Sequence, residues 1–127
     1  KEISRTYVTV RGEDVVVYYT LAFGAVRPDD SPDEIKSGLP SYDIPVMLLA
    51  RLAVDKAEKG NGLGRALLRD AMLRTVQAAD IAGLRAFLVH AKHDEARKYY
   101  EQFGFINSPT NELHLMLSIK DIRANLI

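Results

Sequence analysis

Three alternating glycines form the stretch of this sequence that is best suited to chemistry. Gly60, Gly62 and Gly64 lie between an apolar run and an amphipathic segment. Glycines let backbone N–H groups converge on a phosphate without obstruction by a Cβ atom. A helix N-terminus adds unpaired N–H donors and the positive end of its dipole. With the charges of Lys59 and Arg65, the stretch predicts a pyrophosphate site; the alternative is a tight strand-to-helix turn with packing glycines.

Two other nucleotide-binding motifs do not fit the same stretch. The dinucleotide fingerprint needs Gly-x-Gly-x-x-Gly and an acidic residue after the next strand. Here the pattern is Gly-x-Gly-x-Gly, and Lys92 and His93 follow that strand. The Walker pattern requires Gly-Lys-Ser/Thr, which the sequence lacks.

Composition limits the remaining chemistry. The 127 residues suit a single domain, residues 1–127. The sequence has no cysteine, so the chain can form no disulfide and no thiolate nucleophile. With only three histidines, a multi-histidine metal centre is not expected, and no metal is predicted. The net charge is zero, but residues 51–98 hold 10 Lys or Arg against 6 Asp or Glu. No apolar run reaches the ~18–20 residues of a membrane span, and no signal peptide is visible. The start at Lys1 without Met suggests an N-terminally shortened product.

Hydrophobic patterning predicts a β-β-β-α-β-α-β order. The expected strands cover residues 7–10, 15–22, 45–54, 84–91 and 113–119, and the expected helices cover 64–82 and 94–103. Residues 28–44 are expected to form a loop with one helical turn. Hairpins combined with a strand–helix–strand unit predict an α+β fold with a mixed central sheet flanked by helices.

Local signals place several side chains within these elements. Gly83 is expected to end the first helix, and Asp94 is expected to cap the second. On the second helix, Tyr99 or Tyr100 should face inward. His90 lies in an apolar strand, where a hydrogen-bonded core histidine is the favoured interpretation over a catalyst.

The glycine stretch resembles a motif of the GNAT acetyltransferases (Gcn5-related N-acetyltransferases). Lys59-Gly60-Asn61-Gly62-Leu63-Gly64 is similar to their Gln/Arg-x-x-Gly-x-Gly/Ala, with Lys59 as a departure that keeps the charge. The resemblance implies the GNAT fold and acetyl-CoA as the acyl donor, with its pyrophosphate on the loop and helix and its pantetheine along the preceding strand. The implied cofactor-binding residues are Leu52, Ala53, Val54, Lys59, Gly60, Asn61, Gly62, Leu63, Gly64, Arg65, His93, Ala96 and Tyr100.

A second segment matches the same family. Residues 93–105, with Ala96, Tyr100 and Gly104-Phe105, resemble Asn-x-x-Ala-x-x-x-Tyr-x-x-x-Gly-Phe, with His93 in place of Asn. The resemblance implies that Tyr100 is the catalytic general acid toward the departing CoA thiolate. A phenol of pKa ~10 facing a thiol of ~8.5 can donate a hydrogen bond even where full proton transfer is slightly uphill. The alternative is that Tyr100 is a core aromatic.

The resemblance narrows to the GNAT toxins of bacterial toxin–antitoxin pairs (the TacT/AtaT type). It covers nearly the whole chain and includes Arg5-Thr6-Tyr7-Val8 and residues 49–55. It implies acetylation of the α-amino group of aminoacyl-tRNA in the cytoplasm, a ribbon-helix-helix antitoxin as partner, and a homodimer. The N-terminal strand and helices that usually precede the Arg-Thr-Tyr strand are largely absent. The candidates for tRNA binding are Arg51, Lys92, Arg97 and Lys98.

Three other hypotheses stay open at this point. The chain could be a GNAT enzyme for a protein N-terminus or a small amine, which the zero net charge favours. It could be a non-catalytic acyl-CoA-binding module, as the departures at Lys59 and His93 suggest. It could also be a stable toxin core that only binds the antitoxin.

Overall fold

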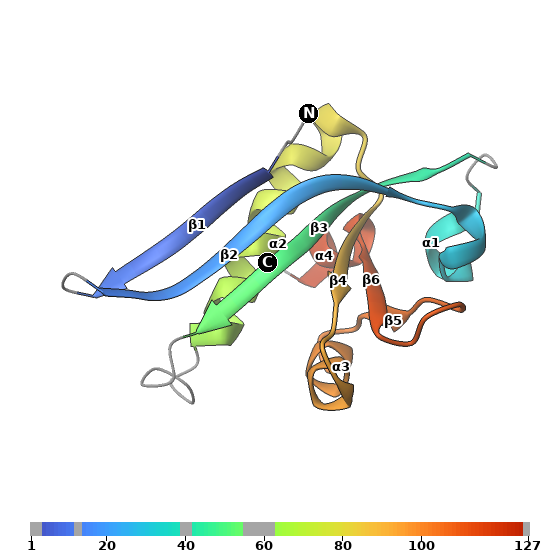
Figure 1. Ribbon diagram of the computed structural model, residues 1–127. Coiled ribbons are helices and arrows are strands. Elements are labelled where there is room, and N and C mark those ends of the chain that lie inside the picture. Colours follow the sequence, from blue (N-terminus) through green and yellow to red (C-terminus); the bar gives the residue numbers. More distant parts are fainter. Residues whose placement is uncertain (1–3, 12–13, 39–41, 55–62, 126–127) are drawn as a thin grey trace.

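The chain forms a six-stranded sheet with helices on both faces, in a computed structural model that describes residues 4–11, 14–38, 42–54 and 63–125. Its strands are β1 (Ser4–Arg11), β2 (Asp14–Val26), β3 (Ile44–Val54), β4 (Ala86–His90), β5 (Ile106–Asn107) and β6 (His114–Ser118). The helices are η1 (Pro28–Asp30), α1 (Asp33–Lys36), α2 (Leu63–Ala82), α3 (Asp94–Glu101) and α4 (Ile119–Asn125). Figure 1 shows their arrangement.

The sheet is mixed, as predicted. The strand order is β1-β2-β3-β4-β6-β5. Strands β3 and β4 are parallel, because α2 carries the chain back between them, and every other neighbouring pair is antiparallel. The predicted hairpin is confirmed in β1 and β2, and both strands extend beyond the predicted ranges.

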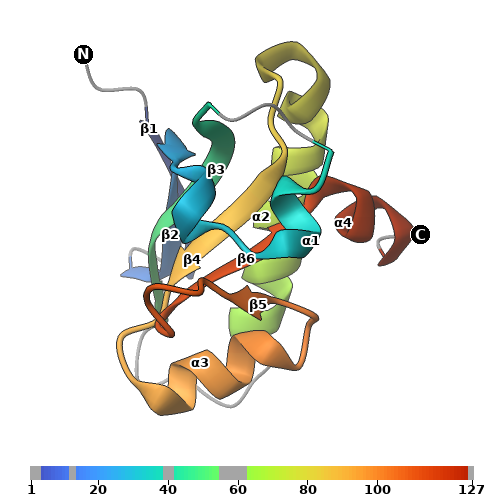
Figure 2. The ribbon, with the colours of Figure 1, turned by 90° about the vertical axis from the view of Figure 1, so that its right-hand side faces the viewer.

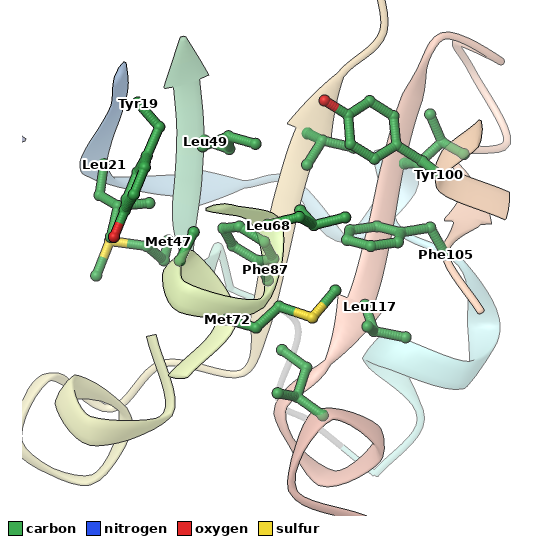
Figure 3. Packing of buried hydrophobic residues seen from close by; sticks show 14 of the residues in the cluster. Tyr19, Leu21, Met47, Leu49, Leu68, Met72, Phe87, Tyr100, Phe105 and Leu117 are labelled. Atoms are coloured by element: carbon green, nitrogen blue, oxygen red, sulfur yellow. The ribbon is translucent and has the colours of Figure 1, made fainter. Parts of the chain in front are cut away.

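Side-chain alternation divides the core between the two faces of the sheet. The larger cluster joins α2, α3 and α4 to one face, called the α2 face below; Figure 3 shows its centre, where Leu68 and Phe87 meet. The smaller cluster joins Ile35 of α1 to the opposite face, called the α1 face, through Val46 and Leu88. Figure 2 shows α1 and α2 against the sheet from the side.

Helix α2 follows the predicted apolar face. Leu68, Ala71 and Thr75 are almost completely buried, whereas Arg65 and Arg69 are exposed. The helix ends as predicted at Gly83, whose φ of 69° lies in the left-handed region that glycine tolerates best. The Leu84 N–H then donates to the Ala79 carbonyl at 3.0 Å, which closes a Schellman-type end.

The C-terminal part differs from the prediction. The last strand was expected to include Ile119, but β6 ends at Ser118 and α4 begins at Ile119. Ile119 and Ile122, three residues apart, are both buried, and the Asp121 N–H donates to the Ser118 hydroxyl at 3.0 Å. One apolar pair at helical spacing was too short a pattern to predict this helix. The two-residue β5 was missed for the same reason.

Candidate active site

The central strands part at one end of the sheet, and this divergence of β3 from β4 beyond Leu49 and Val89 is called the slot below. β3 pairs with β4 at four positions, from Val46 opposite Ala86 to Leu49 opposite Val89. Ala50 follows as an extra residue in a bulge against β2, and β3 then continues to Val54 with β2 as its partner. A bulge bends its strand and increases the local twist. Among the described residues, positions 50–54 therefore have no strand on the β4 side, and Figure 1 shows β3 and β4 diverging.

Helix α3 places Tyr100 beside the slot. The Tyr100 side chain is 9% exposed and packs in the same cluster as Leu49 and Val89, the last paired residues of β3 and β4. Its ring meets the Phe105 ring edge-on, with the centroids 5.6 Å apart. Figure 3 shows the ring over the end of β4 with its hydroxyl directed toward β3. Of the two tyrosines that the sequence left open for the inward position, Tyr100 is the buried one, and its catalytic role stays a prediction.

Burial governs the acidity of this phenol. Removal from water raises the pKa of Tyr100, and neighbouring Tyr99 raises it further. Tyr99 is half-buried, and its pKa is raised chiefly by burial as well. Tyr100 therefore keeps its proton at neutral pH and can donate a hydrogen bond into the slot.

His93, not Asp94, caps α3. The Nδ1 atom of His93 accepts a hydrogen bond from the Ala96 N–H at 3.2 Å. The Asp94 carboxylate instead lies in the first turn and pairs with Arg97 at 3.4 Å. An accepting Nδ1 places the proton of a neutral imidazole on Nε2. His93 thus has one donor left for a ligand, which is compatible with its expected contact to the donor arm.

The first turn of α2 lies against the end of α3. The guanidinium of Arg65 lies over the Phe103 ring, 5.1 Å from its centroid, in a cation–π contact. Arg65 is exposed and Gly64 is half-buried. Lys59, Gly60, Asn61 and Gly62 lie outside the described residues, so the pyrophosphate loop itself stays a prediction.

The strand positions predicted to contact the acyl donor lie along the slot. Leu52 is half-buried and packs against the larger core cluster. The backbones of Arg51, Ala53 and Val54 pair with β2. The side chains of these three residues and of Leu63 lie outside the described part of the structure.

The candidate tRNA-binding residues differ in availability. Lys92 and Lys98 are exposed at the α3 end of the sheet. Arg97 is held by two carboxylates, Asp94 and Glu101, the latter at 3.0 Å, and only 22% of its side chain is exposed. A guanidinium engaged on both sides is a poorer phosphate ligand than the two lysines.

His90 is not a core histidine. It is exposed on the α1 face, and its ring stacks on that of His114 with centroids 3.9 Å apart. The two residues are direct cross-strand partners in β4 and β6. No sequence pattern singled out His114, because its pairing with His90 depends on the register between two strands more than twenty residues apart.

Two further findings concern metals and membranes. No group of three His, Cys, Asp or Glu side chains gathers as a metal site within the described ranges. In that same part of the chain, every helix is too short or too polar to cross a bilayer.

Comparison with known proteins places this geometry among acetyltransferases. Residues 2–107 match the family model described as an acetyltransferase (GNAT) domain. The chain is 56% identical over 121 residues to a tRNA-acetylating toxin of Mycobacterium tuberculosis, which covers 95% of this chain and 72% of the relative.

Solved structures resemble the chain over nearly its whole length. AtaT complexed with acetyl-methionyl-tRNAfMet superimposes with a TM-score of 0.87 at 28% identity, covering 98% of this chain and 76% of AtaT. A mutant of the AtaT toxin bound to the C-terminus of the antitoxin AtaR and to acetyl-CoA gives a TM-score of 0.77 at 28% identity, covering 95% and 70%.

Proposed function

Because the chain belongs to the GNAT acetyltransferase family, we propose that it transfers the acetyl group of acetyl-CoA to the α-amino group of aminoacyl-tRNA. The observation that carries the proposal is the slot beyond Leu49 and Val89 with the Tyr100 phenol beside it. In this role the protein is the toxin of a toxin–antitoxin pair and blocks translation. The 56% identity to a tRNA-acetylating toxin supports the choice of acceptor.

The residues around the slot fit a thioester donor. Acetyl-CoA supplies an activated acetyl group. Within the described ranges, no strand pairs with residues 50–54 on the β4 side of β3, so we propose that their backbone groups hold the pantetheine amides. Arg65 in the first turn of α2 and the Nε2 donor of His93 suit the phosphate-bearing arm.

Tyr100 is proposed to stabilise the departing thiolate. Burial raises the pKa of the phenol, so complete proton transfer to a thiolate, whose conjugate acid has a pKa of ~8.5, is uphill. A hydrogen bond from the phenol to the sulfur still stabilises the charge that develops there. The Tyr100 hydroxyl thus acts in the transition state, and its loss should lower kcat more than it raises KM.

The acceptor needs little help to become a nucleophile. An α-amino group has a pKa of ~7.7–8.0, so part of it is already neutral at pH 7, unlike a lysine at ~10.4. The exposed Lys92 and Lys98 are proposed to contact phosphates near the acceptor end.

The proposal extends to the partners of the protein. The related AtaT binds the C-terminus of the antitoxin AtaR, and we propose a ribbon-helix-helix antitoxin for this chain. The expected homodimer stays a prediction. We propose a cytoplasmic reaction, because charged tRNA and acetyl-CoA are the proposed substrates.

The test measures acetyl transfer from radiolabelled acetyl-CoA to charged tRNA by the wild type, Tyr100→Phe and Tyr99→Phe. Phenylalanine keeps the ring packing of either residue, so the two variants differ in which hydroxyl is lost. We expect label on aminoacyl-tRNA, a loss of about 10²-fold or more in kcat for Tyr100→Phe, and a small change for Tyr99→Phe.

Each of the other hypotheses has its own outcome in this assay. Label on a free amine or a protein N-terminus, but not on tRNA, would favour the small-amine or protein acetyltransferase. Acetyl-CoA binding without transfer to any acceptor would favour a binding module. Equal activities of Tyr100→Phe and the wild type would remove Tyr100 from the mechanism.

A further inference from the structure

His93 holds the start of the helix that carries Tyr100. Its Nδ1 atom accepts from the Ala96 N–H at 3.2 Å, and its carbonyl accepts from the Arg97 N–H at 3.0 Å. The first N–H groups of a helix have no partner within the helix, so a side chain that accepts from one of them stabilises the first turn. Asp94, a commoner type of capping residue, does not compete, because its carboxylate pairs with Arg97.

The shortness of α3 makes this cap important. The helix has eight residues, whereas isolated helices shorter than ~12–15 residues are marginal in water. Of its residues, all of which the structure describes, only Tyr100 is buried, and Ala96 and Tyr99 are half-buried against the larger core cluster. Because few side chains anchor the helix to the core, the order of its first turn depends on the cap.

A short path connects the cap to the phenol. Ala96 and Tyr100 are four residues apart, so they lie on the same face of α3, about one turn from each other. In an α-helix the N–H of residue 100 donates to the carbonyl of residue 96. The residue that His93 holds by its N–H therefore holds the backbone of Tyr100 by its carbonyl. A displacement of the first turn accordingly reaches the hydroxyl that points toward β3 (Figure 3).

The backbone before the cap is fixed to the sheet. β4 ends at His90, and the Ala91 N–H then donates to the Leu113 carbonyl at 2.7 Å. His93 follows this hydrogen bond by two residues in an extended conformation, with φ −164° and ψ 175°. The cap therefore relates the start of α3 to the end of β4, which is one side of the slot.

We propose that His93 is a positioning residue for Tyr100: by capping α3 through Nδ1, it holds the phenol hydroxyl where the thiolate of the departing CoA develops. The inference rests on the proposed function, since it concerns the same acetyl transfer. It goes beyond the expected contact of His93 with the acyl donor, because that contact uses Nε2 and affects donor binding. A misplacement of about 1 Å can cost ~10²-fold in rate, so partial fraying of the first turn is enough to lower kcat.

The test is a double-mutant cycle on acetyl transfer to aminoacyl-tRNA at saturating acetyl-CoA. The proteins are the wild type, His93→Ala, Tyr100→Phe and the double variant. Saturation keeps a contact of Nε2 with the bound donor from appearing as a change in kcat. His93→Asn is the rescue variant, because asparagine is among the best capping residues and alanine is among the poorest. Glu95→Ala is the matched control, at an exposed position in the same turn.

We expect His93→Ala to lower kcat about fivefold, because loss of a cap weakens the first turn without unfolding the protein. His93→Asn should return kcat to within about twofold of the wild type. In the Tyr100→Phe background, His93→Ala should have little further effect, because the hydroxyl that His93 positions is gone. Glu95→Ala should keep kcat within about twofold of the wild type. A thermal unfolding curve checks that each variant is folded.

The outcomes separate the inference from the proposed function. An unchanged kcat in His93→Ala, with aminoacyl-tRNA acetylated by the wild type, overturns the inference and leaves the function standing. An equal loss in the wild-type and Tyr100→Phe backgrounds also overturns it, because His93 then does not act through the phenol. So does a loss that His93→Asn fails to restore, because the cap is then not its cause. If the wild type labels no aminoacyl-tRNA, the proposed function fails and the inference fails with it.

Discussion

Removing the hydroxyl of Tyr19 should destabilise the protein without disturbing its packing. Tyr19 is 1% exposed, and its hydroxyl donates to the Asp70 carboxylate and accepts from Arg74 Nε at 2.9 Å. Its ring stacks on Tyr7 at 5.0 Å. These contacts connect Tyr7 of β1 and Tyr19 of β2 to Asp70 and Arg74 in the middle of α2. Tyr19→Phe keeps the ring in place and removes only the hydrogen bonds.

The size of the effect follows from the surroundings of the two charged partners. A hydrogen bond to a charged group contributes ~1.5–3 kcal/mol. The side chains of Asp70 and Arg74 are each 43% exposed, so water can replace part of what the hydroxyl supplied. We therefore expect a loss of ~1–2 kcal/mol in the free energy of unfolding. For a domain of this size that lowers Tm by about 4–8 °C.

The loss should also depend on pH. Burial acts to raise the pKa of Asp70, but hydrogen bonds from Tyr19 and Arg74 and the Arg74 charge together bring it below its ordinary value. A carboxylate with a lowered pKa contributes stability that is complete above the unfolded pKa of ~3.9 and is lost as pH falls through the folded pKa. Because Tyr19→Phe removes one of the lowering hydrogen bonds, the difference between wild type and variant should narrow in acid.

Urea unfolding of both proteins at neutral pH and at several acidic pH values measures these differences. Tyr18→Phe is the matched control, because Tyr18 is the adjacent, half-buried tyrosine of β2, on the opposite face of the sheet. A Tyr19→Phe variant within ~0.5 kcal/mol of the wild type at neutral pH would refute the reasoning. It would mean that water replaces the hydroxyl completely.

Two further predictions concern a histidine and a glycine. His90 is an exposed residue, but its ring is partly removed from water. This partial desolvation first, and the charge of His114 second, hold the pKa of His90 below its ordinary value, so the unfolded chain binds the proton more readily than the folded protein. The free energy of unfolding should therefore decline as pH falls from ~6.5, the unfolded pKa, toward the lower folded pKa of His90. Urea unfolding midpoints between pH 7.5 and 5 check this. An equal decline in His90→Phe would contradict the assignment to His90. Gly83→Ala should cost ~1–2 kcal/mol, because a φ of 69° strains any residue with a Cβ atom although the space around it is open. Calorimetry would measure this loss, and an unchanged Tm would rule out the strain argument.

The sequence predicted those parts of the fold that local patterns determine. The hairpin, the mixed sheet and the buried face of α2 are of this kind, since each depends on alternation, helical spacing or a left-handed glycine. Spacing also narrowed the inward tyrosine of α3 to Tyr99 or Tyr100, and the structure shows that Tyr100 is the buried one. Asp94 was the wrong cap because a histidine that accepts with Nδ1 is an unusual capping residue, while an aspartate is a common one.

The parts of the site that were missed depend on register between distant segments. The slot arises because the pairing of β3 with β4 stops at Leu49, next to a bulge that only the β2 partner reveals. The stacked pair of His90 and His114 likewise needs the register of β4 with β6. Neither register can be derived from the sequence of one strand alone. Side chains alternate between the two faces of a strand, so shifting one strand by two residues against its partner keeps the same residues on the buried face.

The short ladder between β3 and β4 gives the slot a mechanical property. The part of the sheet with β1, β2 and β3 is joined to the part with β4, β6 and β5 only through the four paired positions of β3 and β4, called the joint here. β3 extends five residues beyond the joint, which is ~17 Å at ~3.3 Å per residue. A tilt of ~5° of one part of the sheet relative to the other displaces the end of β3 by ~1.5 Å. A misplacement of about 1 Å can cost ~10²-fold in rate. We therefore expect the packing of Phe87, which is fully buried at the joint opposite Met47, to affect the alignment of the groups proposed to react.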